Sequence, residues 1–343
     1  MSEKRDYLSK RALMIIGITA LVTLVVGLIL YYTGFNEAFY SSSSTVRAIF
    51  KAISYLGEPI VFLIIVVLLF LAYNKKYAKN LLLVLLFSHY INEVLKSLFQ
   101  DPRPAPNVTD ADPSDEYGVI EASYGFPSGH SQNAVAFWGY LGNEFKDRYK
   151  SKQIPIIPVI LSVIIFLIAI SRIIIGVHDL QDIIGGLLIG MGVLLAFIYL
   201  EPTFSNLYNK INFAGKIIII VIISIVLFLV GTLLYPYAGT QLALTPVPLF
   251  PDSGAFGVVG GVILGFGLGY TLEHQYVKYD PSQLSTKKKI INIIIGIVIA
   301  LLVFIPLEYL LEINSVFYRF TRYAIIAFIL SFVVPLICTK INK

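Results

Sequence analysis

Long apolar segments constrain this chain more than any other feature of its sequence. Ten segments rich in Leu, Ile, Val and Phe approach or exceed the ~20 residues that a helix needs to cross a bilayer. Inside lipid every backbone N–H and C=O must be bonded within the protein, and apolar segments of this length meet that requirement as helices. Hydrophobic residues form 57% of the chain and charged residues 14%, more apolar surface than a soluble domain could hide. The sequence therefore predicts an all-α, polytopic membrane helix bundle.

We expect about ten transmembrane helices. The fourth is the least hydrophobic, and a hydropathy scan alone would miss it. The first is too long for a removable signal peptide and lacks a cleavage-site pattern, so we expect it to be retained as an anchor. The expected spans are Ala12–Tyr32, Ile53–Tyr73, Ala78–Leu98, Ser128–Phe145, Pro155–Ile175, His178–Leu200, Lys216–Tyr235, Gly254–Glu273, Ile290–Leu310 and Phe317–Cys338.

Lysine and arginine fall mainly on one side of this topology. If the N-terminus is cytoplasmic, all but seven of the 26 basic residues lie in inner segments. The positive-inside rule then predicts a multi-pass cell-membrane protein with both termini in the cytoplasm. The net charge of +5 follows from this topology and does not indicate nucleic-acid binding. The seven outer residues are Arg47, Lys51, Lys96, Arg103, Arg172, Arg319 and Arg322.

The segment Ser171–Asp182, SRIIIGVHDLQD, places an arginine, a histidine and an aspartate where two apolar runs meet. His178 and Asp182 are four residues apart, so on a helix they share a face and the carboxylate can hold one ring nitrogen. The other nitrogen is then available as a nucleophile or base. A membrane-surface arginine, a capping aspartate and an uninvolved histidine would fit the same pattern.

A second motif, Lys96–Pro104 (KSLFQDPRP), stands at the outer end of the third span. Lys96 lies near the end of the helix, and Arg103 follows between two prolines that break it. Both cations reach the outer surface, although a snorkelling lysine and a loop arginine would also explain them. The acidic loop Ala105–Phe126 is either a lid or, as we favour, a plain solvated loop.

The third motif lies in Phe126–Ser131, FPSGHS, and predicts a helix start suited to an anion. Pro127 sets up a turn, Ser128 is a natural N-cap, and Gly129 lets the backbone approach a ligand closely. The unbonded N–H groups and positive dipole end of a helix attract negative charge. His130 stands in the first turn; the alternative is an ordinary capped helix with an exposed histidine.

All three motifs emerge on the outer side of the predicted topology. Together they supply three cations and backbone N–H donors, a set that suits a phosphate with two negative charges. No cluster of carboxylates or cysteines is positioned for a metal. We therefore expect the cations to do the work of Mg²⁺, with no metal and no cofactor.

The patterns Lys-x6-Arg-Pro, Pro-Ser-Gly-His and Ser-Arg-x5-His-x3-Asp resemble the signatures of the type 2 phosphatidic acid phosphatase superfamily. That superfamily includes lipid phosphate phosphatases, polyprenyl pyrophosphate phosphatases, glucose-6-phosphatase and the vanadium haloperoxidases. Every motif position matches, and the resemblance covers roughly Ala52–Leu200. With the first span it implies a six-helix phosphatase core, residues 1–200, and leaves residues 201–343 as an additional four-helix membrane region.

The resemblance also implies a role for each motif residue. His178 would attack phosphorus and form a phosphohistidine, with Asp182 orienting its ring. His130 would protonate the leaving oxygen and then activate water. The phosphate oxygens would be held by Lys96, Arg103, Ser128, the Gly129 N–H and Arg172.

These roles favour a metal-independent phosphatase acting on a lipid phosphate or lipid pyrophosphate at the outer membrane face. The enzymatic alternative is a phosphatase of a soluble phosphoester of the sugar-phosphate type. The non-enzymatic alternative is a lipid or phosphate transporter, or a scaffold, with a degenerate site; fold-level analogy alone does not decide between them. Haloperoxidase activity is disfavoured because those relatives are soluble. The expected partners are the lipid substrate and the bilayer.

The last four spans contain no comparable polar cluster. In the eighth span Gly257, Gly261, Gly265 and Gly269 recur at every fourth residue, which predicts a smooth face for close helix packing. That face is either a joint within the chain, as we favour, or the interface of a homodimer.

Overall fold

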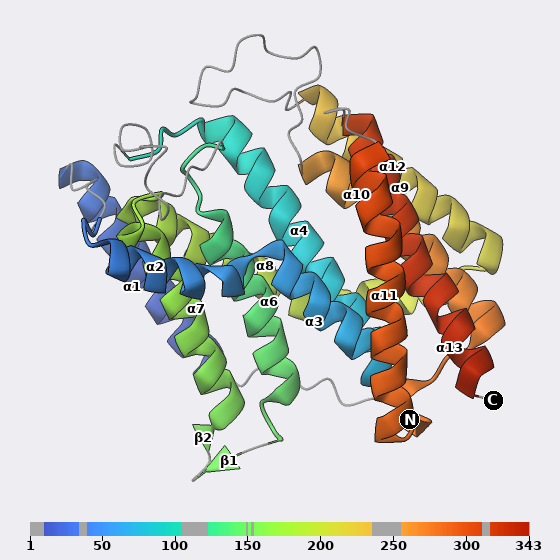
Figure 1. Ribbon diagram of the computed structural model, residues 1–343. Coiled ribbons are helices and arrows are strands. Elements are labelled where there is room, and N and C mark those ends of the chain that lie inside the picture. Colours follow the sequence, from blue (N-terminus) through green and yellow to red (C-terminus); the bar gives the residue numbers. More distant parts are fainter. Residues whose placement is uncertain are drawn as a thin grey trace. The chain divides into compact units, whose positions relative to one another are not determined.

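The computed structural model describes residues 10–33, 40–104, 123–148, 150–151, 154–234, 255–310 and 316–342, which are mainly helical (Figure 1). The α-helices are α1 (Lys10–Thr33), α2 (Ser44–Ser54), α3 (Pro59–Ala72), α4 (Lys75–Phe99), α6 (Gly129–Phe145), α7 (Ile156–Ile174), α8 (Leu180–Asn209), α9 (Phe213–Leu234), α10 (Ala255–Leu272), α11 (Thr286–Leu310), α12 (Val316–Phe328) and α13 (Val334–Asn342). Short 3₁₀ or π segments are η1 (Tyr55–Gly57), η2 (Glu273–Val277), η3 (Pro281–Gln283) and η4 (Ile329–Val333). Strands β1 (Lys150–Ser151) and β2 (Ile154–Pro155) form a small antiparallel pair.

The predicted all-α, multi-pass membrane bundle is confirmed. Within the described residues, seven helices are long and apolar enough to cross a membrane. An eighth span results if Ser44–Gly57 and Pro59–Ala72 are counted as one broken span. Each of the ten expected spans coincides with a helix, and the weakly hydrophobic fourth span is α6, which is 17 residues long.

Contacts group the chain into two compact units. The first contains Met1–Glu58 and Phe99–Ser205, and the second contains Pro59–Leu98 and Asn206–Lys343. The second unit thus takes α3 and most of α4 from the N-terminal half of the chain. The functional division at residues 200 and 201 stays a prediction.

In the first unit, α6 packs along α7, and α2 also packs against α7. The N-terminal ends of α6 and α8 are joined directly, because the Ser128 N–H donates to the Asp182 carbonyl oxygen over 3.0 Å. A small apolar core of Ala169, Ile173 and Ile183 holds α7 to α8 below this junction. The packing therefore gathers helix ends that carry two of the three motifs.

In the second unit, a buried ion pair ties the loop after α10 to the start of α4. Lys75 Nζ lies 2.7 Å from both carboxylate oxygens of Glu273, whose side chain is fully buried. The same carboxylate accepts the Tyr279 backbone N–H, and the Tyr279 hydroxyl is bonded by the Asn292 amide. Buried charges are stable only with such partners, so we assign this network a structural role.

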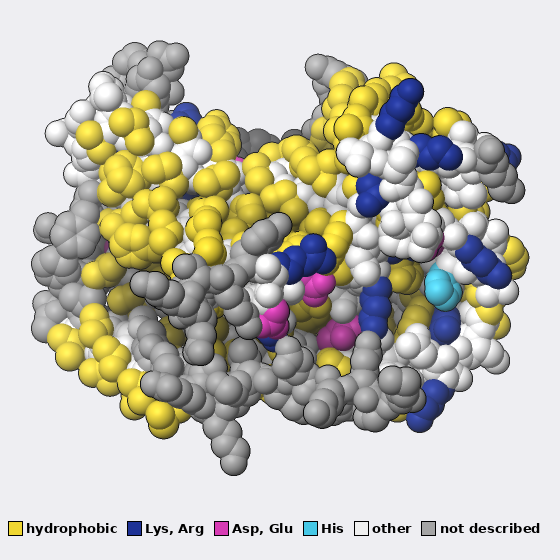
Figure 2. Space-filling view, turned by 90° about the horizontal axis from the view of Figure 1, so that it is seen from below, with side chains coloured by type: hydrophobic (Ala, Val, Ile, Leu, Met, Phe, Trp, Pro, Cys, Tyr) yellow, Lys and Arg dark blue, Asp and Glu magenta, His cyan; other side chains and the backbone are white. Residues whose placement is uncertain are grey.

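The basic face of the second unit agrees with the predicted topology without proving it. Lys278, Lys287, Lys288 and Lys340 are exposed and belong to loops and helix ends that the sequence assigns to the cytoplasm. Figure 2 shows Lys and Arg side chains in dark blue on the face seen from below. The orientation of the protein in the membrane stays a prediction.

The glycine stripe of α10 is a joint within the chain, as favoured from the sequence. α10 packs most extensively against α12, and a Cβ added at Gly257 would lie 2.8 Å from the Val316 carbonyl oxygen. A Cβ at Gly261 would collide with the Phe320 carbonyl oxygen. This face is therefore covered by the chain's own helix, and the stripe offers no argument for a homodimer.

Gly261→Ala should destabilise the protein, because the added methyl has no room against α12. We expect a loss of about 1–3 kcal/mol, read as a lower Tm in detergent. Gly192→Ala is the matched control, since an added Cβ there has nothing within 4 Å and alanine favours a helix. Equal Tm values for the two variants would contradict close packing at the stripe.

Candidate active site

The predicted site residues stand at helix ends. Lys96 is in the last turn of α4, Ser128 is the N-cap of α6, and Arg172 is in the last turn of α7. Asp182 is in the first turn of α8, and His178 precedes that helix by two residues. The expected start of the sixth span at His178 is therefore slightly early, and the pair forms across a helix start.

Of these residues, all but Lys96 belong to the first unit. Lys96 is buried in the second unit, with 5% of its surface exposed. Its place in the phosphate site stays a prediction from the motif.

The His178 ring is held at both nitrogens. Its Nδ1 lies 2.8 Å from Asp182 Oδ2, and its Nε2 lies 3.0 Å from Arg103 Nη1. A guanidinium can only donate hydrogen bonds, so Nε2 must be the acceptor and Nδ1 must carry the proton. The ring is 1% exposed and Asp182 is fully buried. This geometry selects the neutral tautomer with its lone pair on Nε2. From the sequence this nitrogen was expected to be available, whereas in the structure it contacts Arg103.

Arg103 is fixed by the first unit's backbone. Its Nε and Nη1 donate to the carbonyl oxygens of Ser123 and Val177, both at 2.7 Å. Its Nη2 donates to the Ser123 hydroxyl at 3.0 Å. Ser123 lies at the far end of the loop that follows the Lys96–Pro104 motif, so no local sequence signal revealed it. These bonds place a rigid, bidentate cation beside the nucleophile candidate.

The N-terminus of α6 has the predicted capped geometry. The Ser128 side chain accepts the Ser131 N–H, and the Ser131 hydroxyl lies 3.1 Å from the Ser128 hydroxyl. Ser128 is fully buried, while His130 keeps some exposure and contacts Glu58 at 3.1 Å. Arg172, 2% exposed, donates from Nη1 to the Ser54 hydroxyl at 2.7 Å. Sequence reasoning missed both Glu58 and Ser54.

Three carboxylates meet beside the nucleophile candidate, contrary to the expectation that no such cluster is positioned. Oxygens of Asp101, Asp179 and Asp182 all lie within 4.8 Å of one another. Ionised carboxylates this close repel one another, so the group must share a proton or hold a cation. Burial raises the pKa of Asp101, and burial with the charge of Asp101 raises the pKa of Asp179 to about 6. With no cation bound, these raised pKa values let the group hold a shared proton.

The loop suggested as a lid falls largely outside the described residues, which resume at residue 123. The C-terminal end of the loop is bonded to the segment before it, because the Gly125 N–H donates to the Asp101 carbonyl oxygen over 2.9 Å. The lid and solvated-loop alternatives both stay open.

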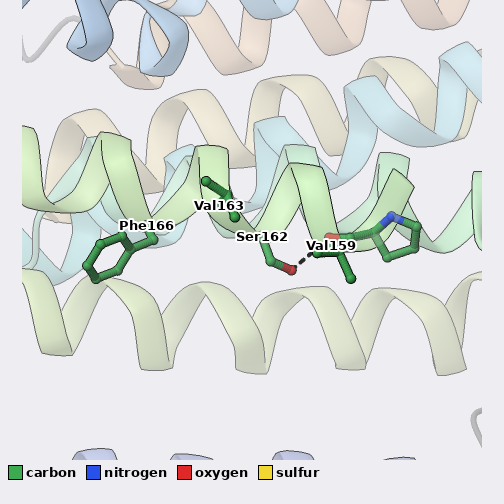
Figure 3. Close-up of a pocket in the computed structure, with 5 residues that line it drawn as sticks. Val159, Ser162, Val163 and Phe166 are labelled. Atoms are coloured by element: carbon green, nitrogen blue, oxygen red, sulfur yellow. Dashed lines mark hydrogen bonds between the residues drawn. The ribbon is translucent and has the colours of Figure 1, made fainter. Parts of the chain in front are cut away.

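An apolar groove elsewhere on α7 is no competing site. Pro158, Val159, Ser162, Val163 and Phe166 line it (Figure 3). The Ser162 hydroxyl is engaged by the Pro158 carbonyl of its own helix at 2.8 Å. These side chains offer no charge or nucleophile, and they lie on a helix apolar enough to face lipid.

Comparison with known families agrees with the motifs. Residues 77–206 match the PAP2 superfamily, and residues 257–343 match the transmembrane extension of PAP2 superfamily phosphatases. The chain therefore carries a PAP2 superfamily domain followed by the transmembrane extension of that superfamily. The extension covers most of the C-terminal region that the motif resemblance did not reach.

Three curated relatives resemble this chain. Phosphatidylglycerophosphatase B of Bacillus subtilis is 33% identical over 130 residues, 37% of this chain and 59% of that protein. Lipid phosphate phosphatase delta of Arabidopsis thaliana is 32% identical over 133 residues, 37% of this chain and 32% of that protein. Sphingosine-1-phosphate phosphatase 2 of Mus musculus is 34% identical over 125 residues, 36% of this chain and 33% of that protein. The matches thus span less than two thirds of each relative.

Asp179→Asn should stabilise the protein at neutral pH. Because the folded state raises the pKa of Asp179 from 3.8 to about 6, it keeps a proton that the unfolded state loses, and stability falls as pH rises through that range. Asparagine keeps an oxygen for the Asp182 N–H cap without the charge. We expect a gain of about 1–2 kcal/mol at neutral pH and none at about pH 3.5. Equal Tm shifts in detergent at both pH values would contradict the shared proton.

Proposed function

We propose that this protein is a metal-independent phosphatase that hydrolyses a lipid phosphate or lipid pyrophosphate at the outer membrane face through a phosphohistidine. The observation that carries the proposal is the His178 ring, held in one tautomer between Asp182 and Arg103. That arrangement directs an unprotonated nitrogen toward the cation best suited to bind a phosphate oxygen.

The first half of the reaction forms a P–N bond. Nε2 of His178 attacks phosphorus in line, and the P–O bond to the leaving group breaks. Asp182 accepts the Nδ1–H throughout and stabilises the positive charge that the ring gains. His130 gives its proton to the departing oxygen, so the lipid product leaves as an alcohol or a monophosphate.

The second half restores the enzyme. His130, now neutral, takes a proton from water, and the water oxygen attacks phosphorus while the P–N bond breaks. Phosphate leaves, and His178 returns to its starting tautomer. Arg103 moves its Nη1 bond from the ring to a phosphate oxygen as substrate binds, and Arg172 with the Ser128–Gly129 helix start holds the others. Lys96 supplies the remaining cation.

A lipid substrate fits the location of these groups. They stand at the ends of membrane-spanning helices, where a phosphate headgroup can be reached while its tail stays in the bilayer. The three relatives are all named for phosphatases of lipid phosphates. A soluble phosphoester remains the alternative substrate class, which a substrate panel distinguishes.

His178→Ala should abolish phosphate release, because the proposed mechanism forms its P–N bond on Nε2 of this residue. The measurement is phosphate released in detergent and EDTA from phosphatidic acid, phosphatidylglycerophosphate, sphingosine-1-phosphate and a polyprenyl pyrophosphate. His274→Ala, which removes an exposed histidine of the second unit, should stay within about twofold of wild type. Release that EDTA stops would overturn metal independence, and release by His178→Ala would overturn the nucleophile. Release from soluble esters alone would overturn the lipid assignment.

Lys96→Met should lower kcat/KM by about 10²-fold or more if the lysine holds a transferring phosphate oxygen. Lys76→Met, which removes an exposed lysine at the other end of α4, should leave kcat/KM unchanged. The comparison uses the best substrate of the panel. Similar values for both variants would remove Lys96 from the phosphate site.

A further inference from the structure

The segment Ser54–Glu58 contains none of the three motifs, yet it contacts two residues of the candidate site and the helix α6 that carries one of them. Ser54 accepts a hydrogen bond from Arg172 at 2.7 Å. The Leu56 carbonyl oxygen accepts the Trp138 indole N–H of α6 at 3.2 Å. Glu58 Oε1 lies 3.1 Å from His130 Nε2. A short segment before α3 is thus bonded to a phosphate-binding arginine and to the proposed proton donor.

The residue before Glu58 is Gly57, whose backbone packs closely against the His130 ring. A Cβ added at Gly57 would lie 2.9 Å from His130 Cδ2 and 2.9 Å from a methyl of Ile168. The Glu58 N–H is bonded to the Tyr55 carbonyl oxygen at 3.0 Å, which closes the η1 turn. The imidazole therefore packs on Gly57 while the next side chain reaches its Nε2.

A carboxylate in this position has two effects on an imidazole. It fixes the ring's rotation by accepting a hydrogen from Nε2, and its negative charge favours the protonated ring. A proton donor needs both, because it must face the leaving oxygen and hold its proton until the P–O bond breaks. The exposed fractions of 15% for His130 and 35% for Glu58 leave a path by which the ring regains its proton from water.

We propose that Glu58 is a positioning residue for His130, which keeps the ring oriented and protonated for transfer to the leaving oxygen. The inference rests on the proposed phosphatase function and assigns a fourth segment, Ser54–Glu58, to the site. It gives a role to a charged residue that stands directly before the apolar helix α3, where a partly exposed ion pair would add little to folding.

The proposal predicts that replacing Glu58 lowers kcat/KM by an amount that depends on the leaving group of the substrate. An alkoxide departs only with a proton, whereas para-nitrophenolate departs without one, so a weakened proton donor affects alkyl esters selectively. The value of kcat/KM reports steps up to the first irreversible one, which is formation of the phosphohistidine. The ratio of kcat/KM for two esters is independent of the fraction of enzyme that is folded, so the ratio separates a catalytic defect from a folding defect.

The test compares dodecyl phosphate with para-nitrophenyl phosphate. For Glu58→Gln we expect kcat/KM to fall about 10- to 100-fold on dodecyl phosphate and less than about threefold on para-nitrophenyl phosphate, with KM unchanged. Glu58→Asp keeps the charge and should recover part of the loss. Glu144→Gln is the matched control, since Glu144 is exposed at the other end of α6 from His130.

Three outcomes would overturn the proposal. Glu58→Gln with full activity on both esters would show that the contact does not serve His130. An equal loss on both esters would show a structural role only. Wild-type enzyme without activity on any ester or panel lipid would remove the proposed phosphatase function, and the role of Glu58 would fall with it. The first two outcomes, with an active wild type, would remove the role of Glu58 alone.

Discussion

A backbone inside a bilayer must bond every N–H and C=O within the protein, and this constraint decides where chemistry can occur in the chain. Helix interiors have no spare donors, whereas a helix start has N–H groups without partners and a helix end has carbonyls. The candidate site follows this rule: Ser128 and Gly129 open α6, Asp182 lies in the first turn of α8, and Arg172 lies in the last turn of α7. The candidate site thus lies where membrane helices leave backbone groups unbonded.

The same constraint explains why the site's charges are bonded to one another and to carbonyls. A buried charge without partners costs several kcal/mol, so each cation here has acceptors. Arg103 is held by two carbonyl oxygens, and Arg172 reaches the Ser54 hydroxyl. In the proposed reaction a phosphate oxygen would replace the His178 ring nitrogen on Arg103 and the Ser54 hydroxyl on Arg172, because it is a stronger acceptor than either. The cations are therefore held in place before substrate binds, which is what stabilisation of a phosphoryl transition state requires.

Local spacing made part of this predictable. Apolar length located a helix for each expected span, and the four-residue interval placed Asp182 on the His178 ring. Contacts between distant segments left no such trace: Arg103 meets a histidine 75 residues away, and Glu58 one 72 residues away. Asp101 and Asp179 were assigned no role from the sequence, and only the folded chain brings them together with Asp182. A single sequence carries periodicity and capping signals, but it carries no signal for which loops share a helix end.

The two histidine–carboxylate pairs of the site differ in a way that suits two different tasks. The pair of His178 and Asp182 is sealed, and Arg103 on Nε2 keeps that nitrogen unprotonated, as a nucleophile requires. The pair of His130 and Glu58 is partly open to water, as a group that gives up a proton and then takes one back requires. Burial and the contact of His178 with Arg103, rather than the carboxylate alone, would divide the roles of nucleophile and acid in the proposed mechanism.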